Sequence, residues 1–192
     1  MPGLTPLEPG KYYHIYNRGN NGENLFIVER NYAYFLNLYA RHIEPVAETF
    51  AYCLLRNHFH LLVRIREQRP ARSQVSQAFS NLFNAYTKSI NSAYRRSGSL
   101  FEKPFQRIEV TTPQYCLRLV HYIHWNPQKH GFVEDFRDYP YSSYHALLSD
   151  RPALLQRDAV LEWFDGRESF DAIHQMLTDE KDIAHLIQDD LD

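Results

Sequence analysis

Residues 57–65, Asn-His-Phe-His-Leu-Leu-Val-Arg-Ile, constrain the fold of this chain most strongly. Phe59 and Val63 fall on one side of the alternation, and His58 and His60 fall on the other. A period of two is typical of a β-strand that packs one face against a core. Because side chains two residues apart share a strand face, the two imidazoles stand close enough to bind one metal ion.

Strand and helix patterns alternate along the rest of the chain. The expected strands cover residues 12–18, 50–55, 57–65 and the end of 100–110. The expected helices cover residues 29–43, 72–94 and a segment that begins at Thr112-Pro113, with a cap residue and a proline at its first position. This order favours the α+β class: a ferredoxin-like or RRM-like antiparallel sheet with helices packed on one face.

The third helix is expected to run to about Trp125 and to be stopped by Asn126-Pro127, because the residue before a proline disfavours helical geometry. Short acidic helices are expected near the end of the chain. We therefore divide the sequence into a main domain, residues 1–148, and an acidic helical C-terminal extension, residues 149–192.

Charge is distributed unevenly, although the whole sequence carries a net charge of −2. Residues 56–131 hold twelve Lys and Arg against three Asp and Glu, whereas residues 132–192 hold five against fifteen. A basic middle around the paired histidines indicates a polyanionic substrate. No apolar run approaches the ~20 residues of a membrane helix, and the N-terminus lacks a signal pattern. We therefore expect a cytoplasmic protein with no membrane partner.

A candidate nucleophile and a candidate third ligand belong to the third helix. Tyr122 and Asn126 are four residues apart and share a helical face if the helix extends that far. An amide oxygen beside two imidazoles gives a three-ligand site with open positions, as suits a catalytic divalent cation. A phenol one turn earlier can attack a phosphodiester and form a phosphotyrosine bond.

Each of these features also has a plain structural interpretation. Tyr122 is one of fourteen tyrosines, and Asn126 before Pro127 is a common turn arrangement. On that interpretation the chain is a structural or RNA-binding RRM-like domain, with His58 and His60 as ordinary polar residues. The joint presence of the features, and their order, favours a site.

Five motifs resemble, in the same order, those of the HUH single-strand DNA transposases with one catalytic tyrosine, in their REP-associated branch. Residues 57–63 match the His-hydrophobic-His motif, and residues 122–133 match the tyrosine-helix signature. The other matching segments are residues 13–19, residues 98–101 with Phe105, and residues 139–144. The likeness covers about residues 10–148. It departs from the pattern at Leu55-Arg56, where Met-Pro is frequent, and at Lys103-Pro104.

The resemblance implies a ferredoxin-like α+β fold with the histidine pair on a central strand. It implies that His58 and His60, assisted by Asn126, bind Mg²⁺ or Mn²⁺. It also implies that Tyr122 attacks single-stranded DNA folded into hairpins, leaving a 5′-phosphotyrosine link and a free 3′-hydroxyl.

Six basic residues are expected to contact the DNA: Arg18, Lys88, Arg95, Arg96, Lys103 and Arg107. An alternative function is that of a domesticated regulatory protein that binds hairpin DNA without cleaving it. The sequence does not distinguish a monomer from a homodimer in which Tyr122 serves the histidines of the other subunit.

Overall fold

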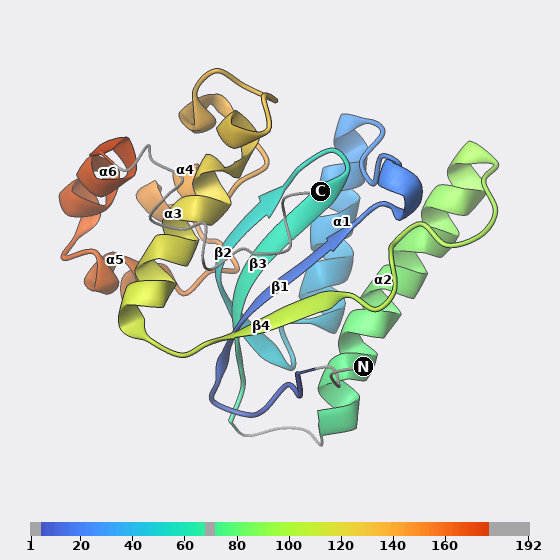
Figure 1. The fold of residues 1–192 in the computed structure, drawn as a ribbon, viewed down its shortest axis with the longest axis horizontal. Helices are drawn as coiled ribbons and strands as arrows, with labels where there is room; N and C mark the ends of the chain where they lie inside the picture. Colours follow the sequence, from blue (N-terminus) through green and yellow to red (C-terminus); the bar gives the residue numbers. More distant parts are fainter. Residues whose placement is uncertain (1–4, 68–71, 177–192) are drawn as a thin grey trace.

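Strands and helices interleave in the order β-α-β-β-α-β-α, and further short helices follow, as Figure 1 shows. The computed structural model describes residues 5–67 and 72–176. Within these residues the strands are β1 (Tyr12–Arg18), β2 (Ala47–Leu54), β3 (His58–Ile65) and β4 (Gln106–Val110). The α-helices are α1 (Glu29–His42), α2 (Arg72–Tyr94), α3 (Pro113–Lys129), α4 (Tyr144–Leu148), α5 (Arg157–Trp163) and α6 (Arg167–Met176), with 3₁₀ turns η1 (Asn20–Gly22) and η2 (Phe136–Asp138).

The four strands form one antiparallel sheet in the order β2-β3-β1-β4. The strand with the histidine pair, β3, is central, as expected. In the register of β1 against β3, Tyr16 lies opposite His60 and Arg18 lies opposite His58. The α+β class and the ferredoxin-like layout are confirmed.

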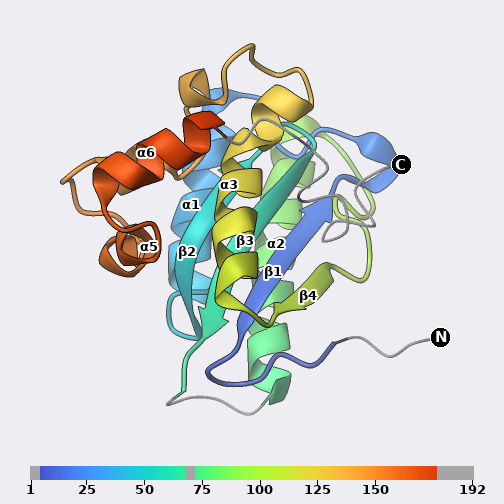
Figure 2. The same ribbon diagram turned by 60° about the vertical axis from the view of Figure 1, so that its left-hand side comes forward.

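Helices cover both faces of this sheet, whereas one covered face was expected. Phe59 and Val63 pack in a core cluster with Phe35 of α1 and Phe79 of α2. Leu62, which points the other way, packs in a second cluster with residues of α3. Figure 2 shows α3 in front of the sheet and α1 and α2 behind it. The second layer forms because β2 and β3 also carry apolar side chains on that face, which α3 removes from water.

Helix α3 begins as the sequence predicts but ends later. The hydroxyl of Thr112 accepts a hydrogen bond from the Tyr115 N–H at 3.1 Å, an N-cap followed by a proline at the first helical position. The predicted stop at Asn126-Pro127 is wrong, because the helix continues to Lys129. Pro127 lacks an N–H and removes one helical hydrogen bond, and it does so close to the helix end, where that loss is small.

The end of α3 is closed by a glycine motif. Gly131 adopts a φ of 68°, in the left-handed region that glycine reaches without steric cost. The Gly131 N–H donates to the Gln128 carbonyl at 3.0 Å, and the Phe132 N–H donates to the Pro127 carbonyl at 2.9 Å. This pair of hydrogen bonds is a Schellman motif. It places Asn126 inside the helix, one turn after Tyr122.

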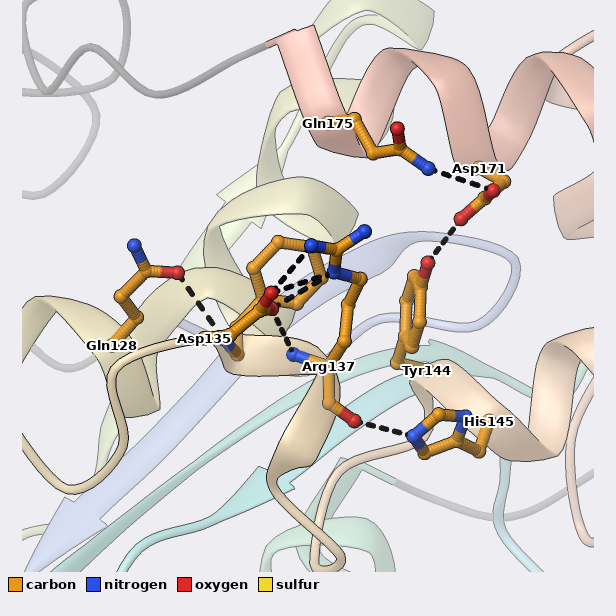
Figure 3. A network of polar contacts seen from close by, with 8 residues as sticks. Gln128, Asp135, Arg137, Tyr144, His145, Asp171 and Gln175 are labelled. Carbon is orange, nitrogen blue, oxygen red and sulfur yellow. Dashed lines mark hydrogen bonds and ion pairs between the residues drawn. The ribbon is translucent and has the colours of Figure 1, made fainter.

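The described part of the C-terminal extension packs onto the second core cluster. Val160, Phe164 and Phe170 are buried in that cluster. Polar contacts add to this packing, because the Tyr144 hydroxyl of α4 donates to the Asp171 carboxylate of α6, as Figure 3 shows. The domain boundary at residue 149 stays a prediction, and residues 177–192 lie outside the described residues. Among the described residues, no helix is long and apolar enough to cross a membrane.

Candidate functional site

Two elements bring polar side chains together on the face of the sheet that α3 covers. His58 and His60 come from β3, and the spacing of two puts both imidazoles on that face. Tyr122 and Asn126 come from α3, where a spacing of four puts them on one side of the helix. The residues predicted as nucleophile and metal ligands are thus neighbours within one chain.

The contacts within this group are short. Asn126 Oδ1 lies 3.2 Å from His58 Nε2, and the Asn126 side chain is fully buried. The rings of His58 and His60 have centroids 5.2 Å apart and are nearly perpendicular. The Tyr122 ring meets the His60 ring edge-on at 5.5 Å.

The donor atoms fit a hard divalent cation. Imidazole nitrogen and amide oxygen are both ligands that such ions accept. The 3.2 Å separation of Asn126 Oδ1 and His58 Nε2 is close to the roughly 3 Å between adjacent ligands of an octahedral site whose bonds are about 2.1 Å long. His60 Nε2 is buried and has no hydrogen-bond partner. No group of three His, Cys, Asp or Glu suited to a metal occurs among the described residues, so a three-ligand site here depends on the Asn126 amide.

The outer nitrogens of both histidines are hydrogen-bonded. His58 Nδ1 lies 2.9 Å from Asn57 Oδ1, and His60 Nδ1 lies 2.9 Å from His14 Nε2. Burial holds the pKa of His60 well below its usual value, and the neighbouring His14 makes the second-largest contribution to this lowering. His60 is therefore a neutral imidazole, which is the form that binds metals.

Sequence reasoning did not find the partners of the two histidines. The sequence signal for His14 was its spacing of two from Tyr16, which puts both side chains on one face of the strand. Its contact with His60 follows from the register of β1 against β3, in which His14 faces Leu62 and is diagonal to His60. Asn57 was expected only as the first residue of the strand that carries the histidines.

A cleft of about 810 Å³ opens beside the histidines. His58, His60, Arg18, Lys129 and His130 are among the residues that line it. Tyr122 and Asn126 are not among its lining residues, and the Tyr122 side chain is 1% exposed.

Lys129 connects this cleft to the tyrosine. Its ammonium group lies 5.2 Å from the centroid of the Tyr122 ring, while the side chain also lines the cleft. A cation over the face of a phenol is attracted to it and favours the phenolate electrostatically. Lys129 follows Asn126 by three residues. Because the helix was expected to end near Trp125, the position of Lys129 beside Tyr122 was not predicted.

A second cleft, of about 740 Å³, adjoins the first. Asn17 and Glu102 line both clefts. Its lining includes the uncharged polar residues Ser80, Asn84 and Thr87 of α2, and the basic residues Lys103 and Arg107.

The six predicted DNA-contact residues divide between these clefts and the end of α2. Arg18 lines the first cleft and forms an ion pair with Glu102 at 2.7 Å. Lys103 and Arg107 line the second, where the Arg107 guanidinium lies 4.0 Å from the Phe105 ring centroid and donates to Ser76 Oγ at 3.1 Å. The three residues that line neither cleft are Lys88 and Arg95, which are exposed, and Arg96, which pairs with Glu23.

Comparison with known proteins gives a relative in sequence and a relative in fold. No protein-family model matches the sequence. A curated protein of Haemophilus influenzae, named as a candidate REP-associated tyrosine transposase, is 30% identical over 106 residues, which cover 51% of this chain and 59% of that protein. A solved structure of a REP-associated tyrosine transposase bound to a REP hairpin matches with a TM-score of 0.60 and 19% identity, over 79% of this chain and 88% of that chain.

These matches agree with the motifs. The resemblance to the REP-associated tyrosine transposases is confirmed, and the structural match supports the α+β fold. This chain spans 59% of the length of the curated relative.

Proposed function

We propose that this chain, which resembles the REP-associated tyrosine transposases in sequence and fold, is a metal-dependent enzyme that cleaves and rejoins hairpin-bearing single-stranded DNA through a 5′-phosphotyrosine intermediate. One observation carries the proposal. Tyr122 and Asn126 lie one turn apart on α3 and face His58 and His60, with Asn126 Oδ1 3.2 Å from His58 Nε2 and the Tyr122 ring 5.5 Å from the His60 ring.

His58 Nε2, His60 Nε2 and Asn126 Oδ1 would hold Mg²⁺ or Mn²⁺. When bound, such a cation would polarise a phosphate oxygen and offset the negative charge that develops on the phosphoryl oxygens. The remaining steps belong to the protein and the DNA. The Tyr122 phenol oxygen forms a bond to phosphorus as the bond to the 3′-oxygen breaks, the phenol proton is lost to solvent, and the departing oxygen takes a proton to become a 3′-hydroxyl.

Lys129 serves the nucleophile in this scheme. A phenol has a pKa of about 10 in water, so attack at neutral pH needs an environment that favours the phenolate. The ammonium group 5.2 Å from the Tyr122 ring centroid provides that stabilisation. The same side chain lines the cleft and offers a cation to a phosphate placed there.

The two adjoining clefts supply the path for the DNA. Arg18 in the first and Lys103 and Arg107 in the second would pair with phosphates of a strand that runs between them. Lys88, Arg95 and Arg96 would extend this basic surface along the end of α2. The REP hairpin bound in the related structure supports a hairpin as the folded part of the substrate.

A second function, hairpin binding without cleavage, is favoured by the burial of the nucleophile. Tyr122 is 1% exposed, so a phosphate in the cleft reaches its hydroxyl only after α3 or the intervening side chains shift. A protein in which that shift never occurs would bind hairpins and leave them intact.

Incubation with end-labelled single-stranded hairpins and Mn²⁺ separates the two functions. Cleavage predicts a covalent adduct that survives denaturing electrophoresis and is lost in Tyr122→Phe, while Tyr115→Phe, on the first turn of the same helix, still forms it. Tight hairpin binding with no adduct at any Mg²⁺ or Mn²⁺ concentration would establish the binding function instead. An adduct that persists in Tyr122→Phe would refute the assignment of the nucleophile.

A further inference from the structure

The outer hydrogen bond of His60 is made to a second histidine that the proposed chemistry does not otherwise use. His14 is fully buried, its Nε2 lies 2.9 Å from His60 Nδ1, and the two rings stack with centroids 5.1 Å apart. Tyr16 stacks on His14 at 4.7 Å and on His60 at 5.8 Å. His14 is thus held rigidly behind the ring that faces the site.

A hydrogen bond between two neutral imidazoles contains one hydrogen, which either ring can donate. If His14 donates, His60 carries its own hydrogen on Nε2, and that nitrogen has no electron pair for a cation. If His60 donates from Nδ1, its Nε2 electron pair points away from His14. Only the second arrangement gives a metal ligand.

The other histidine of the pair shows the arrangement that a ligand requires. His58 Nδ1 lies 2.9 Å from Asn57 Oδ1, an amide oxygen that accepts hydrogen bonds and cannot donate them. With a cation between His58 Nε2 and Asn126 Oδ1, which lie 3.2 Å apart, His58 carries its hydrogen on Nδ1, where Asn57 Oδ1 accepts it, and its Nε2 electron pair faces the cation. For His60 the partner is a ring that can accept or donate, so the arrangement depends on His14.

We propose that His14 is a positioning residue for the metal site: it accepts a hydrogen bond from His60 Nδ1–H and so directs the His60 Nε2 electron pair to the cation. The inference rests on the proposed function, because it assigns a task to a residue behind a proposed ligand. His14 itself contacts neither cation nor DNA. It differs from a merely structural core residue in that its loss weakens metal binding more than folding.

Two variants separate positioning from packing. His14→Phe keeps a flat ring and removes the acceptor, whereas His14→Gln places an amide oxygen near the position of the imidazole Nε2. The chain offers a matched control in His174, another fully buried histidine whose ring nitrogen lies 2.9 Å from a second histidine, His124, on the far side of α3. His174→Phe removes the same kind of contact at a distance from the cleft.

Mn²⁺ affinity is measured by electron paramagnetic resonance, with thermal unfolding of the metal-free proteins and hairpin affinity alongside. His14→Phe is expected to bind Mn²⁺ about 10- to 100-fold more weakly, His14→Gln to recover most of this loss, and His174→Phe to bind Mn²⁺ as the wild type does. Hairpin affinity should change little in all three. Unchanged Mn²⁺ affinity in His14→Phe would overturn the inference while leaving the proposed function intact.

A measurement on the unsubstituted protein keeps the test independent of folding of the variants. In Mg²⁺-loaded protein labelled with ¹⁵N-histidine, the ring nitrogen shifts report which nitrogen of His60 carries the hydrogen. We expect it on Nδ1, and a hydrogen on Nε2 would overturn the inference. His58→Ala separates failure of this inference from failure of the proposed function. If the wild type binds no Mn²⁺, or if His58→Ala binds Mn²⁺ as tightly as the wild type, the metal-dependent function is refuted, and this inference with it.

Discussion

At Asn126 a neutral amide, and not a carboxylate, supplies the oxygen of the proposed metal site. The side chain is fully buried, its Oδ1 lies 3.2 Å from His58 Nε2, and its Nδ2 has no hydrogen-bond partner. A buried polar atom without a partner costs about 1–3 kcal/mol, so structural needs alone do not favour asparagine here. The proposed cation at Oδ1 would account for this residue type.

Substitutions at Asn126 test that role. Asn126→Leu is expected to weaken Mn²⁺ binding by at least about tenfold, because an oxygen ligand is lost. Asn126→Asp is expected to bind Mn²⁺ at least as tightly as the wild type, because a carboxylate adds a negative charge beside the ion. Isothermal titration with Mn²⁺ measures both. Equal affinity in wild type and Asn126→Leu would show that Asn126 is not a ligand.

The residues of the site could be predicted from the sequence only in part. Spacing on one strand placed His58 with His60, and spacing on one helix placed Tyr122 with Asn126. The contact between His14 and His60 could not be predicted, because it depends on how two strands align. The sequence also gave no indication that Tyr122 is buried behind the cleft, which depends on how α3 packs on the sheet.

At the scale of elements, α3 is held between the sheet on one side and α6 on the other. His124, two residues after Tyr122, is joined to His174 of α6 through ring nitrogens 2.9 Å apart, and its other nitrogen lies 2.7 Å from Ser143 Oγ. The C-terminal extension therefore contacts α3 on the side away from the cleft.

This buried histidine contact makes stability depend on pH. Burial lowers the pKa of His174 to about 3 and holds the pKa of His124 well below its usual value. The nearby His121 lowers both pKa values further, whereas Asp171 raises the pKa of His174. In the unfolded chain both rings titrate near pH 6.5. Their contribution to stability is therefore fully present above about pH 6.5 and is lost as the pH falls toward 3.

Urea unfolding between pH 7 and pH 4.5 measures this dependence. The free energy of unfolding should fall below about pH 6.5 by up to about 1.4 kcal/mol per pH unit for each such histidine. His174→Phe removes one of these groups and should give a shallower fall. An identical slope in the variant would contradict the assignment of this dependence to His174.

Helix boundaries show where sequence reasoning at this scale succeeds and fails. The start of α3 was predictable because a cap residue and a proline mark it locally. Its end was not, because the proline stop is overruled by the glycine motif at Gly131 and by burial of Asn126 and Pro127. The second layer of helices was missed because alternation along β3 identifies one apolar face and leaves the partner of the other face undetermined.

At the scale of the whole molecule, the fold separates the charges. The basic residues at the two clefts lie on β1, β4, the loop before β4 and the end of α3, whereas the described acidic residues of the extension belong to the segments that pack against α3 from the other side. This arrangement agrees with the polyanionic substrate predicted from the charge split, because a polyanion is attracted to one sign of charge and repelled by the other. The ferredoxin-like antiparallel sheet was predicted from the succession of elements.

Peptide mapping of the covalent DNA adduct tests the central claim most directly. A hairpin-bearing single strand is incubated with the protein and Mn²⁺, the product is digested with protease and nuclease, and the modified peptide is sequenced by mass spectrometry. We predict a nucleotide remnant linked through its 5′-phosphate to Tyr122, and no such peptide from protein in which His58 is replaced by alanine. A remnant on another residue, or cleaved DNA with no linked peptide, would contradict the account.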